Sequence, residues 1–136
     1  GTICAHRCQG KCSRNFYDES VHIRDTKLVA AEHGYGALMA SMKPTAKLPG
    51  KKAAIIGGGP TGIAAAYFLA RGGVETTIFE REAKLGGVPR YVIPAFRISD
   101  EALDKDVALM ERLGVEVKCG APAPSNSSRR WATPTS

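Results

Sequence analysis

The fold of this chain is decided by residues 53–66, which read AAIIGGGPTGIAAA. A short apolar run, Ala53–Ile56, stops at a glycine-rich turn of the form G-x-G-x-x-G, and a helical, small-residue pattern follows. A strand, a tight turn and a helix in this order begin a dinucleotide-binding βαβ unit. The alternative is a plain strand-to-helix turn, since glycines gather in many turns.

The residues of this turn suit a pyrophosphate. Gly57 allows a sharp turn out of the strand, Gly59 lets phosphate approach the backbone, and Gly62 lets the helix pack closely on the strand. The free N–H groups and the positive end of the helix then face the anion. The predicted pyrophosphate-binding glycines are Gly57, Gly59 and Gly62.

The second strand, predicted at Val74–Phe79, ends at Glu80, 18 residues after Gly62. An acidic residue at this point accepts hydrogen bonds from ribose hydroxyls and disfavours a 2′-phosphate. Arg81 argues weakly the other way, because an arginine here meets the 2′-phosphate of NADP. The whole context favours dinucleotide binding over a structural turn.

A helix capped by Ser99 or Asp100 and ending before Gly114 comes next, and a third strand is predicted at Val115–Cys119. The apolar face of this helix comprises Leu103, Val107, Met110 and Leu113. The order of elements predicts an α/β fold: a partial doubly wound, Rossmann-like parallel sheet preceded by a small helical, cysteine-bearing segment. Because such a sheet should not stop after three strands, we expect a truncated fragment.

Four segments are predicted along the chain. They are a helical, cysteine-bearing segment at 1–42, a Pro/Gly-containing linker at 43–52, the dinucleotide-binding βαβ domain at 53–120 and a tail at 121–136. In the first segment we expect a helix capped by Ser20 and interrupted at Gly34 and Gly36. The tail is rich in Pro, Ser and Thr, and we expect it to be disordered.

Composition excludes several classes of protein. A hydrophobic content of 43% and a charged content of 24% are typical of globular proteins. No apolar run approaches the ~20 residues of a membrane span, and no secretory signal is recognised, so we expect a cytoplasmic protein. The net charge is +6, but the excess of basic residues lies outside the βαβ domain. The domain itself has eight basic and nine acidic residues, so nucleic-acid binding is not expected.

Cys4, Cys8 and Cys12 are spaced four residues apart, which indicates metal ligation rather than disulfides in a cytosolic chain. Spacing alone favours an iron–sulfur cluster and a zinc site equally. A Cys3His zinc site would use His6, which stands two residues from both Cys4 and Cys8 and so crowds a tetrahedron. Cys119 is expected to be a buried apolar residue.

Residues 86–117 read GGVPRYVIPAFRISDEALDKDVALMERLGVEV. With the upstream cysteines and the glycine turn, this run resembles the small subunit of glutamate synthase, the N-terminal part of dihydropyrimidine dehydrogenase and related iron–sulfur flavoprotein subunits. In that family a helical domain that holds [4Fe–4S] clusters precedes an FAD domain. The resemblance covers residues 1 to about 120.

The resemblance implies that the dinucleotide is FAD and that the cysteines ligate a [4Fe–4S] cluster. It implies that Gly57, Gly59, Pro60, Thr61 and Gly62 bind the pyrophosphate and that Glu80 lies at the adenosine ribose, with Arg81 beside it as a further candidate contact of the cofactor. It also implies that Gly87 and Val88 lie beside the flavin nucleotide and that Arg97 contacts FAD. The alternative for Arg97 is a solvated surface arginine. The implied cluster ligands are Cys4, Cys8 and Cys12, with the remaining ligands outside this chain.

Four positions depart from the family pattern. Pro89 and Val92 stand where the family has Leu and Gly, and Ser99 replaces a Pro but suits a helix cap. Lys27 stands where the family has a cluster-ligating Glu or Gln, and a charged lysine cannot ligate a cluster. One coordination site is therefore in question.

The resemblance implies an oxidoreductase subunit that passes electrons from NAD(P)H through FAD to iron–sulfur clusters and a larger partner. No catalytic residue is assigned, and no second G-x-G-x-x-G is present, so the chain alone is expected to be inactive. Two alternatives are an NAD-binding domain without flavin and a non-catalytic docking module stabilised by zinc.

Overall fold

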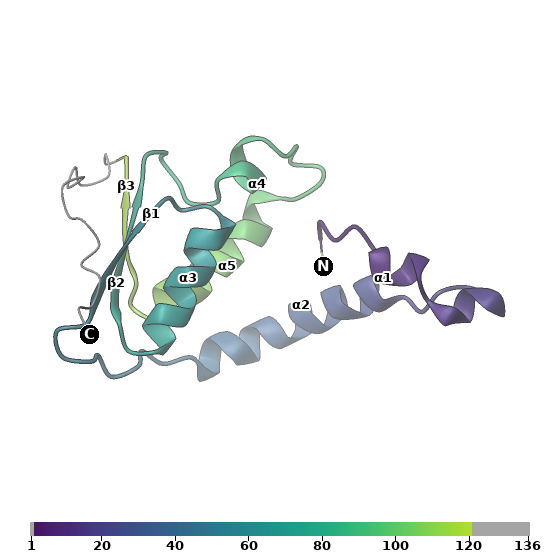
Figure 1. The fold of residues 1–136 in the computed structure, drawn as a ribbon, viewed down its shortest axis with the longest axis horizontal. Helices are drawn as coiled ribbons and strands as arrows, with labels where there is room; N and C mark the ends of the chain where they lie inside the picture. The colour runs from purple at the N-terminus through teal and green to yellow at the C-terminus, as the bar shows by residue number, and fades with distance from the viewer. Residues whose placement is uncertain (1, 121–136) are drawn as a thin grey trace, which may run out of the picture.

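The computed structural model describes residues 2–120. The elements in chain order are α1 (Arg7–Gly10), the 3-10 helix η1 (Ser13–Phe16), α2 (Ile23–Ser41), β1 (Lys52–Ile56), α3 (Pro60–Arg71), β2 (Glu75–Glu80), α4 (Val88–Tyr91), α5 (Asp100–Arg112) and β3 (Glu116–Cys119). Figure 1 shows α3 and α5 packed beside the strands, with α2 leading away to the N-terminal segment. The predicted tail, 121–136, lies outside the described residues.

The three strands form one parallel sheet in the order β1-β2-β3. Ile55 of β1 lies opposite Ile78 of β2, and Ile78 lies opposite Val117 of β3. Parallel strands require crossover connections, and here α3 and the α4–α5 segment provide them. The predicted α/β class and its partial Rossmann-like sheet are confirmed.

One face of the sheet carries the core. Side chains alternate between the two faces of a strand, so β2 directs Thr76, Ile78 and Glu80 to the buried side. Ile78 and Met110 of α5 are fully buried, as is Ala66 of α3. The predicted apolar face of α5 is confirmed, since Leu103, Met110 and Leu113 are buried and Val107 packs against the core.

Local sequence explains how the two covering helices begin. Pro60 is the first residue of α3, where the missing N–H costs nothing. A Cβ on Gly62 would overlap the Gly57 carbonyl oxygen, so the close packing predicted at this glycine is confirmed. The Ser99 hydroxyl accepts from the Ala102 N–H at 3.4 Å and caps α5, and Gly114 follows the helix with φ of +83°.

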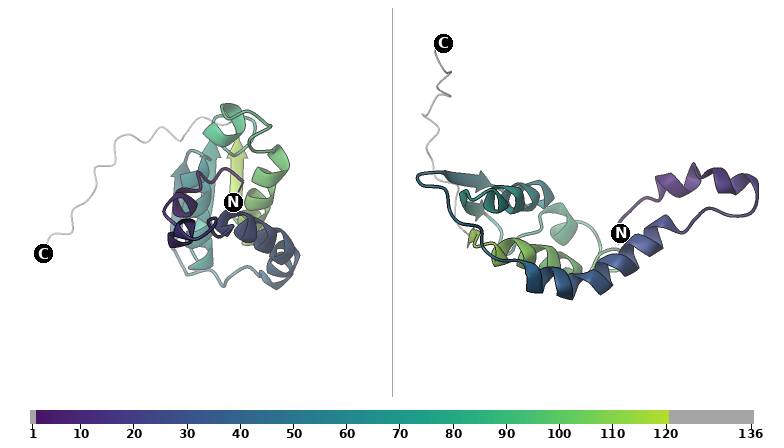
Figure 2. Two further views of the ribbon diagram at one scale, coloured as in Figure 1. Left: turned by 90° about the vertical axis from the view of Figure 1, so that its right-hand side faces the viewer. Right: turned by 90° about the horizontal axis from the view of Figure 1, so that it is seen from below.

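Two predictions about the N-terminal segment are wrong. Helix α2 runs without a break through Gly34 and Gly36, because both glycines lie in open space and the surrounding residues favour helix. Its N-cap is His22 rather than Ser20. None of its residues is buried, and the Tyr35 hydroxyl donates to the Lys105 carbonyl of α5 at 3.2 Å. Figure 2 shows α2 passing along α5.

Between residues 2 and 120, every helix falls short of the length and apolar character that crossing a bilayer requires.

The sheet offers a test of which face carries the stability. Replacing Ile78, which is fully buried, with Ala should lower the free energy of unfolding by about 3 kcal/mol, because it leaves a cavity between β2 and the helices. Urea unfolding of the chain measures the loss. Ile56→Ala is the matched control: this isoleucine is 68% exposed, and its truncation should cost less than about 1 kcal/mol. Equal losses in the two variants would contradict this assignment of the core.

Candidate dinucleotide-binding site

Two glycine turns meet where β1 and β2 end. The Gly86 N–H donates to the Gly58 carbonyl at 2.8 Å, and a Cβ on Gly87 would lie only 2.9 Å from the Gly59 Cα. Gly57 and Gly87 have φ of +99° and +57°, a region that glycine adopts without strain. The two backbones therefore approach each other with no side chain between them.

The N-terminus of α3 opens beside these turns. Its first intrahelical hydrogen bond is donated by Ile63 to the Gly59 carbonyl at 3.0 Å. The N–H groups of Thr61 and Gly62 come before that bond, so they are left for an external acceptor. Together with the helix dipole, they favour an anion such as a pyrophosphate.

Glu80 ends β2 beneath the first turn, and its side chain is buried. One carboxylate oxygen accepts from the Gly58 N–H at 2.6 Å, and the other accepts from the Glu82 N–H at 3.0 Å. These bonds, that of Glu82 above all, hold the pKa of Glu80 below its usual value even though burial opposes them. The ionised carboxylate thus ties the first turn to the segment after β2. It retains lone pairs for further donors, such as ribose hydroxyls.

A cavity of about 500 Å³ lies at this end of the sheet, within the size range of cofactor sites. Its lining residues are Ile56, Gly57, Phe79, Glu80, Arg81, Glu82, Gly87, Val88, Tyr91 and Val92. Five of the predicted contacts, Gly57, Glu80, Arg81, Gly87 and Val88, are therefore brought together. The Arg81 side chain is exposed at the cavity and pairs with Glu82 at 3.2 Å.

Arg97 lies elsewhere. It is exposed and lines a separate cavity of about 630 Å³ with residues of the N-terminal segment, among them Cys4 and His6. The structure does not place Arg97 beside the glycine turns, because the loop that precedes α5 carries it toward the cysteine-bearing segment. Its contact with a dinucleotide stays a prediction.

The three N-terminal cysteines are free thiols that stand on different pieces of structure: Cys4 precedes α1, Cys8 lies within it, and Cys12 stands just before η1. Over residues 2–120 no group of three or more Cys, His, Asp or Glu side chains is placed to hold a metal ion. The predicted ligand set is thus not assembled in this structure. Hydrogen bonds from backbone groups of Val21 and Arg14 lower the pKa of the Cys12 thiol, which favours the ligating thiolate form.

The prediction that Cys119 is buried is wrong. This residue is exposed, because β3 is an edge strand and its middle residue, Val117, is the one that packs against the core.

The chain is similar to known oxidoreductases over most of its length. Residues 55–109 match a family model described as an NAD(P)-binding Rossmann-like domain. Over 121 residues the chain is 43% identical to the putative oxidoreductase YgfK of Escherichia coli (strain K12), an alignment that covers 88% of the chain and 12% of YgfK. It is 33% identical over 120 residues to the glutamate synthase [NADPH] small chain of Mycobacterium tuberculosis (strain ATCC 25618 / H37Rv), covering 88% and 25%.

It is also 35% identical over 125 residues to the NAD-dependent dihydropyrimidine dehydrogenase subunit PreT of Escherichia coli (strain K12), covering 88% and 30%. The chain is a homologue of these oxidoreductases and oxidoreductase subunits over 88% of its length. It spans 12% to 30% of the lengths of the three relatives. The resemblance stated from the sequence to the glutamate synthase small subunit and to dihydropyrimidine dehydrogenase is thereby confirmed.

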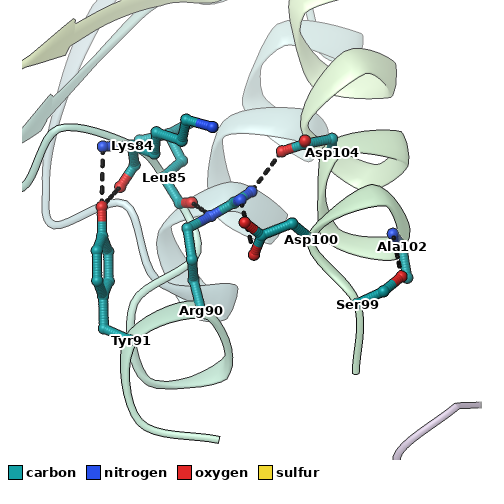
Figure 3. Close-up of polar contacts among 8 residues, drawn as sticks. All are labelled: Lys84, Leu85, Arg90, Tyr91, Ser99, Asp100, Ala102 and Asp104. Atoms are coloured by element: carbon teal, nitrogen blue, oxygen red, sulfur yellow. Dashed lines mark hydrogen bonds and ion pairs between the residues drawn. The ribbon is translucent and has the colours of Figure 1, made fainter. Parts of the chain in front are cut away.

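Arg90, which lies beside these turns, has no role predicted from the sequence. The Arg90 side chain is 5% exposed, its Nε donates to the Leu85 carbonyl at 2.5 Å, and its guanidinium pairs with Asp100 and Asp104 of α5 (Figure 3). A signal for it exists in the sequence, namely an arginine three residues after Gly87 and two aspartates spaced four apart at the start of the next helix.

Glu80→Gln tests the carboxylate. Glutamine keeps one oxygen that can accept but turns an NH2 group, which cannot accept, toward the second backbone N–H, so the free energy of unfolding at pH 7 should fall by about 1–3 kcal/mol. The folded-state pKa of Glu80 is lowered, so its contribution is complete above the unfolded-state pKa of about 4.3 and disappears as pH falls below it. Urea unfolding between pH 3 and pH 7 should therefore show a flatter profile for the variant.

Glu75→Gln is the matched control. Glu75 begins the same strand and forms a largely exposed ion pair with Lys52 at 3.2 Å, so its loss should cost less than about 1 kcal/mol. An unchanged pH profile in Glu80→Gln would refute the role given to the buried carboxylate.

Proposed function

We propose that this chain forms the pyrophosphate- and ribose-binding part of the FAD site in an NAD(P)H-dependent oxidoreductase subunit. In the whole subunit, electrons pass through FAD to iron–sulfur clusters and on to a larger partner enzyme. The observation that carries the proposal is the meeting of two side-chain-free turns, 57–59 and 86–87, at the N-terminus of α3 beside the ionised Glu80.

Each part of this arrangement has a task toward the cofactor. The unpaired N–H groups of α3 bind the pyrophosphate, and Gly59 and Gly87 leave room for it. Glu80 holds the first turn and offers its free lone pairs to ribose hydroxyls. Bound FAD would supply the redox chemistry, accepting a hydride and releasing single electrons, while the protein orients it.

The second glycine turn favours FAD over a nicotinamide dinucleotide. The Rossmann fingerprint for NAD(P) needs the first turn and the acidic residue after the second strand, and it gives no task to a second turn in contact with the first. A nicotinamide dinucleotide at the same turn is the second candidate. The match of residues 55–109 to an NAD(P)-binding model favours it.

The N-terminal segment completes the proposal. Cys4, Cys8 and Cys12 are proposed as ligands of a [4Fe–4S] cluster whose other ligands lie outside the chain, and Arg97 as a further contact of FAD. Free thiols agree with a cytoplasmic location, where thiols stay reduced. The relatives are named as a chain of glutamate synthase and a subunit of dihydropyrimidine dehydrogenase, which supports a partner subunit that receives the electrons.

Gly59→Ala separates binding from folding. A Cβ at Gly59 would lie 4.0 Å from the Gly87 Cα, an ordinary contact, so the fold should keep its melting temperature. The added methyl group occupies the gap that the pyrophosphate needs, and FAD affinity should fall about tenfold or more. Flavin fluorescence titration and thermal unfolding of the 136-residue chain measure the two quantities.

Gly36→Ala is the control for this substitution. Gly36 lies in α2 with open space around it, so the change should leave FAD binding unaltered and stabilise the helix by about 0.5–1 kcal/mol. A wild-type chain that binds no FAD would refute the proposal. Tighter binding of NAD than of FAD would support the second candidate instead.

A further inference from the structure

Arg90 joins three parts of the chain that are separate in sequence. It lies in the single turn of α4, directly after the second glycine turn, and its Nε donates to the Leu85 carbonyl at 2.5 Å (Figure 3). A Cβ on Gly86 would come within 2.8 Å of the Arg90 Cβ and 2.9 Å of its Nε. The side chain of Arg90 therefore folds back over Gly86, and only glycine leaves space for it there.

The guanidinium continues from the turn to α5. Its Nη1 lies 3.1 Å from an oxygen of Asp100, an ion pair without hydrogen-bond alignment, and its Nη2 bonds to Asp104. The aspartates are 63% and 56% exposed, whereas the arginine side chain is 5% exposed. A buried cation is costly unless it is paired, so the start of α5 and the glycine turn are held by the same group.

Tyr91 acts on the neighbouring peptide. Its hydroxyl accepts from the Lys84 N–H at 3.0 Å and donates to the Lys84 carbonyl at 3.1 Å. Consecutive side chains of α4 thus hold the peptide groups of Lys84 and Leu85, just before the Gly86 N–H that donates to Gly58. The hydrogen bond from this N–H to the Gly58 carbonyl connects the two turns directly.

We infer that Arg90 is a positioning residue that holds the 86–87 turn against the 57–59 turn through its bonds to Leu85 and to the α5 aspartates. These bonds hold the turn in the conformation in which Gly87 lies against Gly59. Its effect on ligand binding rests on the proposed function, since a pyrophosphate-containing ligand needs both turns in place.

The test measures exchange of the Gly86 amide hydrogen by NMR in the full chain without ligand. Arg90→Met keeps the bulk of the side chain and removes its charge, and Gly86 exchange should become about tenfold faster or more. The Val74 amide, which donates to Leu69 at the opposite end of α3, should not change. Arg90→Lys should be intermediate, because an ammonium group cannot reach Leu85 and both aspartates with a fork of donors.

Two controls separate positioning from general stability. Asp104→Asn removes one partner and leaves Arg90 in place, so it should also speed Gly86 exchange, whereas Asp106→Asn on the same helix should not. Leu113→Ala destabilises the core at the far end of α5 and should leave Gly86 exchange unchanged under native conditions. Unchanged Gly86 exchange in both Arg90→Met and Asp104→Asn, or an equal rise in Leu113→Ala, would overturn the inference.

FAD titration distinguishes this inference from the proposed function. Arg90→Met should raise the dissociation constant for FAD about tenfold or more while Asp106→Asn leaves it unchanged. If the wild-type chain binds no FAD but Gly86 exchange rises in Arg90→Met, the proposed function fails and the positioning role stands. If the wild type binds FAD and Arg90→Met binds it equally well, the inference fails and the proposed function stands.

Discussion

Both backbone polar groups of Gly58 hold the ends of the first two strands together. Its N–H donates to the buried carboxylate of Glu80 at 2.6 Å, and its carbonyl accepts from Gly86 at 2.8 Å. A Cβ at this position would overlap the Leu85 Cδ2 and lie 3.1 Å from a Glu80 carboxylate oxygen, so both side chains would have to shift to admit it. The hydrogen bonds of Gly58 fix the position of the second turn, and the N-terminus of α3 and the cavity lie directly beside them.

The rest of the domain supports this junction from two directions. Beneath it, Ile78 and the apolar face of α5 form a core on one face of the parallel sheet. Beside it, Arg90 connects the loop after β2 to the first turn of α5. The chain thus presents a preorganised backbone in which the groups proposed to bind a dinucleotide are mostly peptide N–H groups rather than side chains.

Prediction from sequence succeeded where neighbouring residues decide the structure. The glycine turn with its helix and strand, the Ser99 cap and the periodic face of α5 depend on residues a few positions apart, and all were confirmed. Prediction failed at Gly34 and Gly36, where an exposed helix tolerates glycines that were expected to break it. It failed at Cys119 because a sequence does not reveal which strand lies at the edge of a sheet.

The sequence by itself determined the chemistry of the first turn and the acid that follows the second strand, since strand, turn and helix signals are local. Only the tertiary structure decided that the two glycine turns touch and that the Glu80 carboxylate accepts from the N–H groups of Gly58 and Glu82. It also decided that Arg97 lies near the cysteine-bearing segment rather than near the glycine turns. The role of Arg90 belongs to the same group. Apart from the short-range bonds to Glu82 and Leu85, these contacts join elements separated by a crossover or a loop, and the path of the chain between them is set by packing rather than by local preference.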